Sequence, residues 1–437
     1  MSKGARLSKV VGASASIAAM ALLAACSTSS PDPTATGTTG GGNGAETVTL
    51  EFAQWWEPEL PEGELRGLMD TFEAANPGIK VKLLSGPYAS TKEQVVAGAA
   101  SGTMSDVVGL DGAWVSDFVK QGAITDLSAL MSSAGYDDTQ LASQIQLGGK
   151  TYMIPVVNFA YMLFTNDDLL AQAGVTAAPS TRSEFRDDAK KVTALGNNTS
   201  GWILPLSLEA PNGIQNDVMS WAWASGGSML TADGQPDVTN DAVRSATNFI
   251  VDLNSDGSIA PGAATLKEQD KVEEFTNGRV GMMIDSLAHI NLIRDSNADL
   301  NFSIHAVPAE DGYTGKRGTP YASWGIGVAE NSTHKAEAFK LIEFLMSPDV
   351  NSELSNSAHA FPGNVGAVPD YVNSDPMFKT AFDVWNSGYP ANEFVGLPVA
   401  EQLMRDFGEQ LQSTLEGKQS VDDALTKAQA AWVKDFQ

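Results

Sequence analysis

Apolar and polar residues follow a regular order over the first structured part of the chain. Residues 48–52, 79–83 and 107–110 are short apolar or alternating runs that predict strands. Residues 64–75 place apolar side chains at i, i+3, i+4 and i+7, which predicts an amphipathic helix. Residues 90–101 begin with a serine and a glutamate spaced as a capping box, which predicts a second helix. The resulting order, β-α-β-α-β, indicates a parallel sheet with right-handed crossovers.

A different pattern occupies the stretch from residue 149 to residue 170. Two apolar, β-favouring runs follow each other at 152–157 and 159–164. A single polar residue, Asn158, separates them, without a turn pair that would make a hairpin. The simplest interpretation is a chain that leaves one core and enters another through Asn158. We therefore expect this stretch to cross between two lobes.

Length and charge narrow the class of protein. The chain has 437 residues, more than one hydrophobic core usually serves, so two or more domains are expected. Its 27 basic and 53 acidic residues give a formal net charge of -26. Such an excess of negative charge opposes binding to phosphate backbones and to anionic membrane surfaces. Nucleic acid is therefore not an expected partner.

The amino-terminal segment has the features of a targeting signal. Basic residues precede an apolar run that ends in Leu23-Ala24-Ala25-Cys26, the single cysteine of the chain. The segment resembles the lipobox of a bacterial lipoprotein signal, which implies removal of residues 1–25 and lipidation of Cys26. The alternative is an ordinary secretory signal in which the cysteine stands by chance. Residues 26–45 hold no large apolar side chain beyond that cysteine and predict a flexible, lipid-anchored tether.

Two patterns resemble metal sites without completing them. Residues 252–257 imitate the opening of an EF-hand calcium loop, but the twelfth position is Ala263 where a bidentate glutamate is required. We interpret this segment as a helix end followed by a turn. The histidines are scattered without zinc-ligand spacing. No metal and no other cofactor is therefore expected.

Aromatic and acidic residues follow the three predicted strands. Ligands of open parallel sheets bind beyond the carboxyl ends of the strands, and the residues there are Trp55, Trp56, Glu57, Tyr88, Asp111 and Trp114. Flat aromatic rings cover the C–H faces of sugars, and carboxylates accept hydrogen bonds from hydroxyl pairs. Trp114 has a structural alternative, because it shares a helical face with Phe118. Adjacent Trp55 and Trp56 cannot both point the same way, and we favour Trp55 for the site.

Several later segments carry a family resemblance. Residues 274–285 read Glu-Phe-Thr-Asn-Gly-Arg-Val-Gly-Met-Met-Ile-Asp, and residues 323–347, 102–110 and 417–425 fit the same family in order. Together they resemble extracellular solute-binding proteins of carbohydrate ABC transporters, the maltose-binding-protein-like family, over residues 46–437. The resemblance implies an α/β fold with two lobes, each a sheet flanked by helices, joined by three crossing segments.

The resemblance also implies where the chain passes between the lobes. Crossings are expected near Val157-Asn158, near Val307-Pro308 and near Ala329-Glu330. The N-terminal lobe would then hold residues 46–157 and 309–329. The C-terminal lobe would hold residues 158–308 and 330–437.

Strand ends and the resemblance together give the expected ligand-binding residues. Many members of the family place a tryptophan soon after the segment that ends at Asp285, whereas this chain has Ser286 to His289, so a polar subsite is expected there. Trp221 and Trp223 lie two apart on a helix-like run and face different ways, and Trp223 is expected in the core. The full set is Trp55, Glu57, Tyr88, Asp111, Trp114, Asn158, Asn212, Trp221, Asp285, His289, Tyr321, Trp324 and Phe361.

The predicted function is that of a lipid-anchored substrate-binding component of an ABC importer, a monomer without enzymatic activity. It would capture an oligosaccharide by lobe closure on the outer face of the cytoplasmic membrane, in a Gram-positive type bacterium, and deliver it to permease subunits. A secreted glycoside hydrolase is the alternative from another class, although no pair of carboxylates is singled out and no catalytic motif was found. The same fold could also bind a polyol, a peptide or a sugar phosphate; a phosphate would ask for arginines that the predicted strand ends lack.

Overall fold

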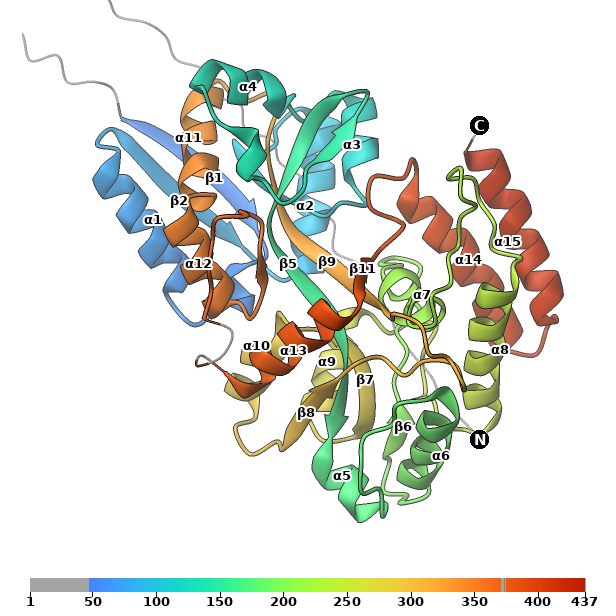
Figure 1. The fold of residues 1–437 in the computed structure, drawn as a ribbon. Helices are drawn as coiled ribbons and strands as arrows, with labels where there is room; N and C mark the ends of the chain where they lie inside the picture. The colour runs from blue at the N-terminus through green and yellow to red at the C-terminus, as the bar shows by residue number, and fades with distance from the viewer. Residues whose placement is uncertain (1–46, 371–372, 374, 437) are drawn as a thin grey trace, which may run out of the picture. The chain divides into compact units, whose positions relative to one another are not determined.

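The computed structural model describes residues 47–370, 373 and 375–436 (Figure 1). The expected signal, the lipidated Cys26 and the tether lie outside the described residues. Residues 46–437 form one compact unit of mixed α/β structure. None of the helices in the described part of the chain is long and apolar enough to cross a membrane.

The first part of the fold is the predicted β-α-β-α-β unit. Strand β1 (Val48–Gln54) pairs in parallel with β2 (Ile79–Ser85) and with β3 (Val107–Leu110), and helices α1 (Glu64–Ala75) and α2 (Tyr88–Ser101) connect them. The prediction of a parallel unit is confirmed. The capping box at the start of α2 was wrong, because the helix begins two residues earlier, after Pro87, and the Ser90 hydroxyl donates to the Pro87 carbonyl oxygen.

Seven strands form a continuous path in the order β2-β1-β3-β9-β5-β7-β6. Strand β9 runs antiparallel to β3 and β5, and β5 runs antiparallel to β7. Shorter strands pair at the side of this path. Besides β1, β2 and β3, the path contains β5 (Lys150–Asn166), β6 (Ser200–Trp202), β7 (Val280–Ser286) and β9 (Gly318–Val328). The strands at its side are β4 (Ile145–Leu147), β8 (Phe302–His305), β10 (Phe361–Pro362) and β11 (Tyr389–Ala391).

Strand β5 belongs to both halves of this path. Its first part, up to Ala160, pairs with β9, and its next residues, from Tyr161 on, pair with β7 and then β8. The sequence suggested two strands split at Asn158, but the structure has one strand of 17 residues. The change of partners falls between Ala160 and Tyr161. Figure 1 shows β5 running between the two groups of elements.

Close approach of strands explains one glycine near the middle of the sheet. A Cβ atom on Gly325 of β9 would lie 2.6 Å from the Leu110 carbonyl oxygen of β3. It would also lie 2.0 Å from the Met153 Cε atom of β5. Only a residue without a side chain lets β9 pass between these two strands at their observed separation.

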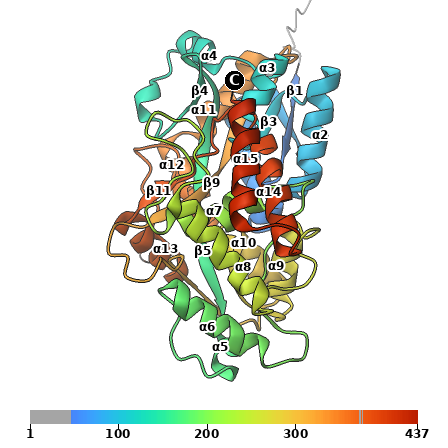
Figure 2. The ribbon, with the colours of Figure 1, turned by 90° about the vertical axis from the view of Figure 1, so that its right-hand side faces the viewer.

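Helices cover both parts of the sheet. Around β1 to β3 lie α1, α2, α3 (Val115–Gln121), α4 (Leu127–Ala134), α11 (Lys335–Leu345) and α12 (Pro348–Ser357) (Figure 1). Around β6 to β8 lie α5 (Asp167–Gln172), α6 (Arg182–Thr193), α9 (Glu268–Thr276), α10 (His289–Ser296) and α13 (Pro376–Ser387). Figure 2 shows α14 (Ala400–Leu415) and α15 (Val421–Asp435) packed together beside α8 (Asp241–Ser255) and α7 (Met219–Trp223).

Backbone hydrogen bonds near two of the expected crossing points bear on where the chain would pass between the lobes, and the crossings stay a prediction. Ala309 exchanges backbone hydrogen bonds with Ser180 and Arg182 on the side of β6 to β8, and β9 follows it and pairs with β3. Ala329 and Glu330 bond to backbone next to β3, and α11 packs on β1, β9 and α4. The chain leaves this half only near β10, which pairs with β5 at Asn158.

The calcium-like segment is a helix end, as interpreted. Asp252 lies in the last turn of α8, and Asp256 follows the helix directly. The guanidinium of Arg186 binds both carboxylates. These two acids therefore already have a cationic partner.

Candidate functional site

A cavity opens where β1 and β3 end. We call it the central cavity; it consists of an enclosed space of about 40 Å³ and an adjoining pocket of about 170 Å³. Phe159 and Tyr161, from the middle of β5, line it. The two spaces share Trp55, Glu59, Tyr88, Asn212, Glu268 and His289, and the enclosed one adds Asp111, Phe159, Tyr161, Asn216, Ser286, Ala288, Ala322, Ser323 and Trp324.

Six of the residues expected from the sequence line the central cavity. They come from the segments that follow β1, β2, β3, β6 and β7, and from β9. They are Trp55, Tyr88, Asp111, Asn212, His289 and Trp324. Their shared position agrees with the strand-end argument, and their contact with a ligand stays a prediction.

Three expected aromatic residues do not line the central cavity. Trp221 is fully buried against Phe185, Trp202 and Phe249 in the helical core. Phe361 stacks on Trp385, with ring centroids 4.6 Å apart, and Tyr321 meets the same ring edge to face. These three rings therefore pack against other rings and not at the central cavity, and no observation supports their contact with a ligand.

Four more of the residues expected at the site also lie outside the lining of the central cavity. They bond to other polar groups or pack behind the residues that line it. Glu57 accepts a hydrogen bond from Ser85, and Asn158 accepts one from the Ser323 hydroxyl at 2.8 Å. Trp114 lies behind Trp55 and Tyr88, with ring centroids 5.6 and 5.3 Å away. Asp285 is fully buried beneath the cavity. None of these four side chains lines the cavity.

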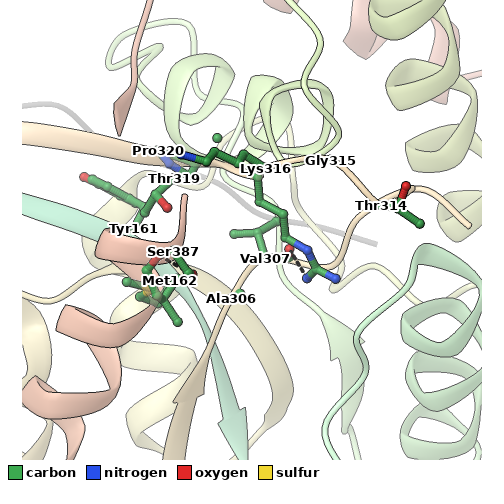
Figure 3. A pocket seen from close by; sticks show the side chains of 13 residues that line it. Tyr161, Met162, Ala306, Val307, Thr314, Gly315, Lys316, Thr319, Pro320 and Ser387 are labelled. Atoms are coloured by element: carbon green, nitrogen blue, oxygen red, sulfur yellow. Dashed lines mark hydrogen bonds between the residues drawn. The ribbon is translucent and has the colours of Figure 1, made fainter. Parts of the chain in front are cut away.

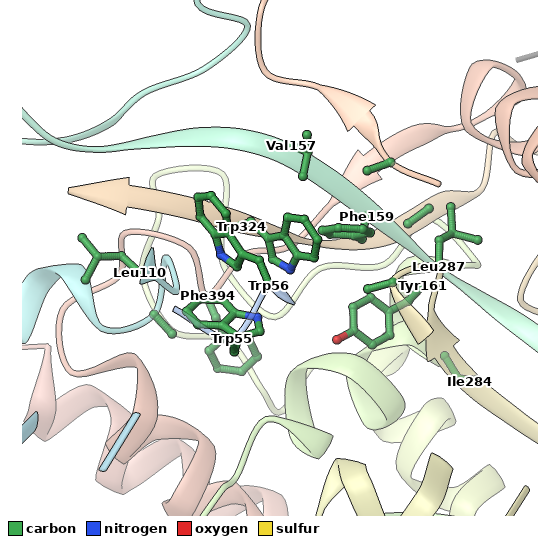
Figure 4. Packing of buried hydrophobic residues seen from close by; sticks show 14 of the residues in the cluster. Trp55, Trp56, Leu110, Val157, Phe159, Tyr161, Ile284, Leu287, Trp324 and Phe394 are labelled. Carbon is green, nitrogen blue, oxygen red and sulfur yellow. The ribbon is translucent and has the colours of Figure 1, made fainter. Parts of the chain in front are cut away.

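Aromatic rings form one wall of the central cavity (Figure 4). Trp324 stacks on Trp56 with ring centroids 5.3 Å apart and planes at 8°, and Phe159 lies 4.7 Å from Trp324 on its other flank. Trp55 meets Tyr88 edge to face at 5.3 Å. Trp56 is therefore the structural member of the adjacent pair and Trp55 the lining one, as expected.

A buried set of charges supports the opposite wall. The fully buried Lys271 ammonium lies 3.2 Å from Asp217 and 3.2 Å from Asp285, and donates to the Ile284 carbonyl oxygen at 2.6 Å. His289 Nδ1 lies 2.9 Å from the second oxygen of Asp285. Burial raises the pKa of Asp217 to about 8 despite the nearby ammonium. Although burial opposes its charge, the Asp285 carboxylate raises the pKa of His289 to about 9.

Glu59 joins this set from the other side of the cavity. Its carboxylate accepts a hydrogen bond from Trp324 Nε1 at 2.9 Å and lies 3.8 Å from His289 Nε2. Burial raises the pKa of Glu59 to about 7. Sequence reasoning chose Glu57 instead. The chain turns into a 3-10 helix at Glu57–Glu59, and this turn brings the second glutamate to the cavity.

Glu268 is held in the cavity by uncharged groups. Its two carboxylate oxygens accept hydrogen bonds from the Tyr161 hydroxyl at 2.8 Å and from Asn212 Nδ2 at 2.7 Å. Asn216 donates to the Tyr161 hydroxyl at 2.9 Å from a π-helical turn, Ile214–Val218. Such turns often occur at functional sites. The sequence offered no signal for this contact, because Glu268 reads as an ordinary acidic residue at a helix start.

A metal ion has little room among these groups. Glu268, Asp285 and His289 each offer a ligand atom, and these atoms lie within 4.8 Å of one another. The Lys271 ammonium already lies 3.2 Å from Asp285 and supplies a positive charge at that place. A second cation there would meet two charged neighbours, Lys271 and a protonated His289. We therefore assign no metal to this cluster.

A second pocket lies on the far side of Tyr161 (Figure 3). It has a volume of about 270 Å³ and is lined by parts of β5, the segment 314–320 and two residues of α13. Its charged residues are Lys316 and Arg317, and Arg317 donates to the carbonyl oxygens of Val307 and Ser180. It has one aromatic ring and no carboxylate. The central cavity is therefore the better candidate for a polar, ring-shaped ligand.

Contacts beside the cavity tie its two sides together. Lys92 of α2 forms an ion pair with Glu401 of α14, and both side chains are mostly buried. The Gly396 amide donates to the Gly112 carbonyl oxygen at 3.4 Å. The cavity is thus bounded by segments far apart in the sequence.

Comparison with known proteins assigns the fold and the family. The family model for the bacterial extracellular solute-binding protein matches residues 51–352. A binding protein of Brucella abortus is 29% identical over 368 residues, which cover 82% of this chain and 86% of the relative. A galactooligosaccharide-binding protein of Bacillus subtilis is 22% identical and covers 85% of this chain and 86% of its own length.

A solved structure gives the same architecture. An ABC transporter solute-binding protein from Thermotoga lettingae, bound with α-D-tagatose, superposes with a TM-score of 0.76 at 21% identity. The alignment covers 90% of this chain and all of that chain, 100%. The predicted two-lobed α/β fold of this class is therefore confirmed.

A substitution of Lys271 tests whether its buried ammonium stabilises the fold. Replacing Lys271→Met is expected to cost about 3 to 5 kcal/mol of unfolding free energy, because Asp217 and Asp285 would stay buried without their cation. Urea unfolding measures this cost. Lys82→Met, which removes an exposed lysine paired with Glu51, is the control and should change the free energy by at most about 0.5 kcal/mol. Equal losses in both variants would contradict the assigned role.

The raised pKa of Glu59 predicts that the unfolding free energy depends on pH. Its pKa lies above the ordinary value of 4.5, so between about pH 4.5 and 7 the folded protein binds a proton that the unfolded chain releases. The contribution of Glu59 to the unfolding free energy should therefore fall as pH rises through this window, by at most about 3 kcal/mol.

The matching variant is Glu59→Gln, which cannot titrate. The difference in unfolding free energy, wild type minus variant, should decline from low to high pH across the window. Glu62→Gln removes an exposed carboxylate nearby and controls for net charge. A difference that stays constant or grows with pH would show that Glu59 is not a buried acid of raised pKa.

Proposed function

Because the chain belongs to the family of bacterial extracellular solute-binding proteins, we propose that it is the solute-binding component of an ABC sugar importer. The observation that carries this proposal is the central cavity. It combines the rings of Trp55, Tyr88 and Trp324 with the carboxylates of Asp111 and Glu268. Rings of this kind pack on the C–H faces of sugars, and carboxylates accept hydrogen bonds from pairs of hydroxyls.

An oligosaccharide enters this site only if the protein opens. The two spaces of the central cavity, about 40 and 170 Å³, are together smaller than the roughly 300 to 1,000 Å³ of most ligand pockets. These small volumes support the proposal that the structure corresponds to a closed arrangement. We propose that the solute binds an open form and that contacts from both sides of the cavity then favour closure, since a ligand shifts an equilibrium only by its differential affinity.

We place the boundary between the lobes along β5. The first lobe holds β1 to β3 with α1 to α4, and also α11 and α12, which pack on them. The second lobe holds β6 to β8 with α5 to α10 and α13 to α15. This division moves residues 330 to about 360 from the second lobe, where the sequence put them, to the first. The crossings would be β5, β9 and the segment around β10.

The proposal also includes how the protein is anchored to the membrane and how it delivers the solute to a permease. The lipobox-like segment that ends at Cys26 supports cleavage, lipidation and a place on the outer face of the cytoplasmic membrane. A flexible tether over residues 26–45 would let the binding unit reach its permease while it stays at the membrane. The permease subunits are the expected partners.

Tryptophan fluorescence tests the proposal directly, because Trp55 and Trp324 line the cavity. Titration with a panel of neutral oligosaccharides should give a saturable change in emission, and chromatography should recover each sugar unchanged. Release of shorter sugars would mean a hydrolase. Absence of a response to every saccharide would contradict sugar binding.

A matched pair of variants locates the binding. Asp111→Asn keeps the shape of the side chain but removes its charge, and should weaken saccharide binding by about 1 to 3 kcal/mol because charge-assisted hydrogen bonds are lost. Asp70→Asn removes an exposed carboxylate on α1 and should bind as the wild type does. Calorimetry measures both affinities. Unchanged affinity in folded Asp111→Asn would remove Asp111 from the site.

A further inference from the structure

We propose that the second pocket, on the far side of Tyr161, binds a small organic acid through its carboxylate group. The pocket has a volume of about 270 Å³ (Figure 3). Among the residues that the structure describes, Tyr161 is the lining residue that this pocket shares with the central cavity. The inference therefore goes beyond the proposed sugar binding and does not depend on it.

The second pocket holds positive charge that no acid of the described chain neutralises. Its charged lining residues are Lys316 and Arg317, and neither forms an ion pair within residues 47–370, 373 and 375–436. Each of the other arginines in this range pairs with a carboxylate; they are Arg66, Arg182, Arg186, Arg244, Arg279, Arg294 and Arg405. In a chain with a formal net charge of -26, an arginine without an acid is an exception.

The acids that precede these two cations in the same segment have other partners. Glu310 lies 3.7 Å from the Arg182 guanidinium, and Asp311 accepts a hydrogen bond from the Ser183 amide at 3.3 Å. Neither acid lines the second pocket. The charge of Lys316 and Arg317 therefore remains available to an anion.

Backbone carbonyl oxygens orient Arg317 without neutralising it. The guanidinium donates to the carbonyl oxygen of Val307 at 3.3 Å and to that of Ser180 at 3.1 Å. A guanidinium has five N–H donors, so these two contacts leave donors for a ligand. The Tyr389 amide donates to the Arg317 carbonyl oxygen at 3.1 Å and holds the backbone in place. Arg317 is therefore positioned before any ligand binds.

Close packing also fixes the loop that carries Lys316. The Tyr313 hydroxyl donates to the Lys316 carbonyl oxygen at 2.7 Å. A Cβ atom on Gly315 would lie 2.5 Å from the Tyr313 hydroxyl oxygen, so this contact needs a residue without a side chain. The rim of the pocket is thus held by a specific contact.

A buried hydroxyl in the same pocket is unused. Thr319 of β9 is 3% exposed, and its hydroxyl has no hydrogen-bond partner in the described part of the chain. Buried hydroxyls are normally hydrogen-bonded, because an unpaired one has lost its contacts with water. A carboxylate oxygen in the pocket would accept this hydrogen bond.

Apolar walls favour an organic acid over an inorganic oxyanion. Met162, Val307, Pro320 and Val384 line the pocket beside the charged and hydroxyl groups. Such walls stabilise a ligand with a carbon body, since its apolar surface leaves water. The planar fork of Arg317 matches the two oxygens of a carboxylate. Inorganic phosphate would use the cations but not the apolar walls.

The test compares acids with amides of the same shape. Acetate, hexanoate and benzoate are titrated into the protein by calorimetry at neutral pH and constant ionic strength, beside acetamide, hexanamide and benzamide. Inorganic phosphate completes the panel. Hexanoate or benzoate is expected to bind at least about tenfold more tightly than its amide, because the amide lacks the charge, and more tightly than acetate, because it covers the apolar walls.

Variants locate the bound carboxylate. Arg317→Gln should weaken the binding of the tightest carboxylate by about tenfold, because its charge-assisted hydrogen bonds are lost. Lys316→Met and Thr319→Val leave the carbonyl contacts of Arg317 in place and should each weaken this binding by about threefold to fivefold. Lys120→Met removes an exposed lysine of α3 and should bind as the wild type does. Near-UV circular dichroism checks that the variants are folded.

The outcomes separate this inference from the proposed sugar binding. Equal affinities for acids and amides, no binding of any carboxylate, or tighter binding of phosphate than of every carboxylate would each overturn the inference. Wild-type affinity in all three pocket variants would place the anion elsewhere and overturn it as well. Saccharide affinity, measured on the same variants, should stay at the wild-type value. A parallel loss of saccharide affinity would overturn a separate anion site.

Discussion

Hydrogen bonding along a single strand is the constraint on which this molecule depends. Strand β5 has 17 residues, its first part bonds to β9, and its second part bonds to β7 and β8. Because the partners change between Ala160 and Tyr161, the two halves of the fold meet at that point. Tyr161, Phe159 and the facing Trp324 of β9 all line the central cavity. The strand that connects the halves therefore also builds the floor of the site between them.

The buried charged residues beside the cavity are the second constraint on the site. A fully buried lysine, Lys271, is tolerable only because Asp217 and Asp285 lie within 3.2 Å of it. Asp285 in turn orients His289 toward Glu59, so the buried ion pairs position a residue of the cavity wall. Of the carboxylates that face the cavity, Glu268 accepts hydrogen bonds from uncharged groups, the Tyr161 hydroxyl and the amides of Asn212 and Asn216.

Local patterns predicted the fold well and the site in part. The alternation and helical spacing before residue 110 place β1, α1, β2 and β3 correctly, because each pattern is decided by neighbours in the sequence. Strand ends likewise identified Trp55, Tyr88 and Asp111. Tertiary packing decided the rest.

Tertiary packing also explains why the position of some residues relative to the cavity differs from the prediction. Trp221 and Phe361 pack against other rings, and nothing local in the sequence distinguishes a ring that packs in this way from one that lines the cavity. Glu59 was missed because a 3-10 turn changes which side chain faces the cavity, and Glu268 because its partners come from three separate segments.

The central claim is that the halves joined by β5 close on a saccharide. It is tested most directly by a distance between spin labels at Gln94 on α2 and Asp295 on α10, both exposed, in a chain whose single cysteine, Cys26, is replaced by serine. The account predicts a broad, longer distance without solute and a narrow, shorter one when a binding saccharide saturates the protein. An unchanged distance at saturation would contradict closure.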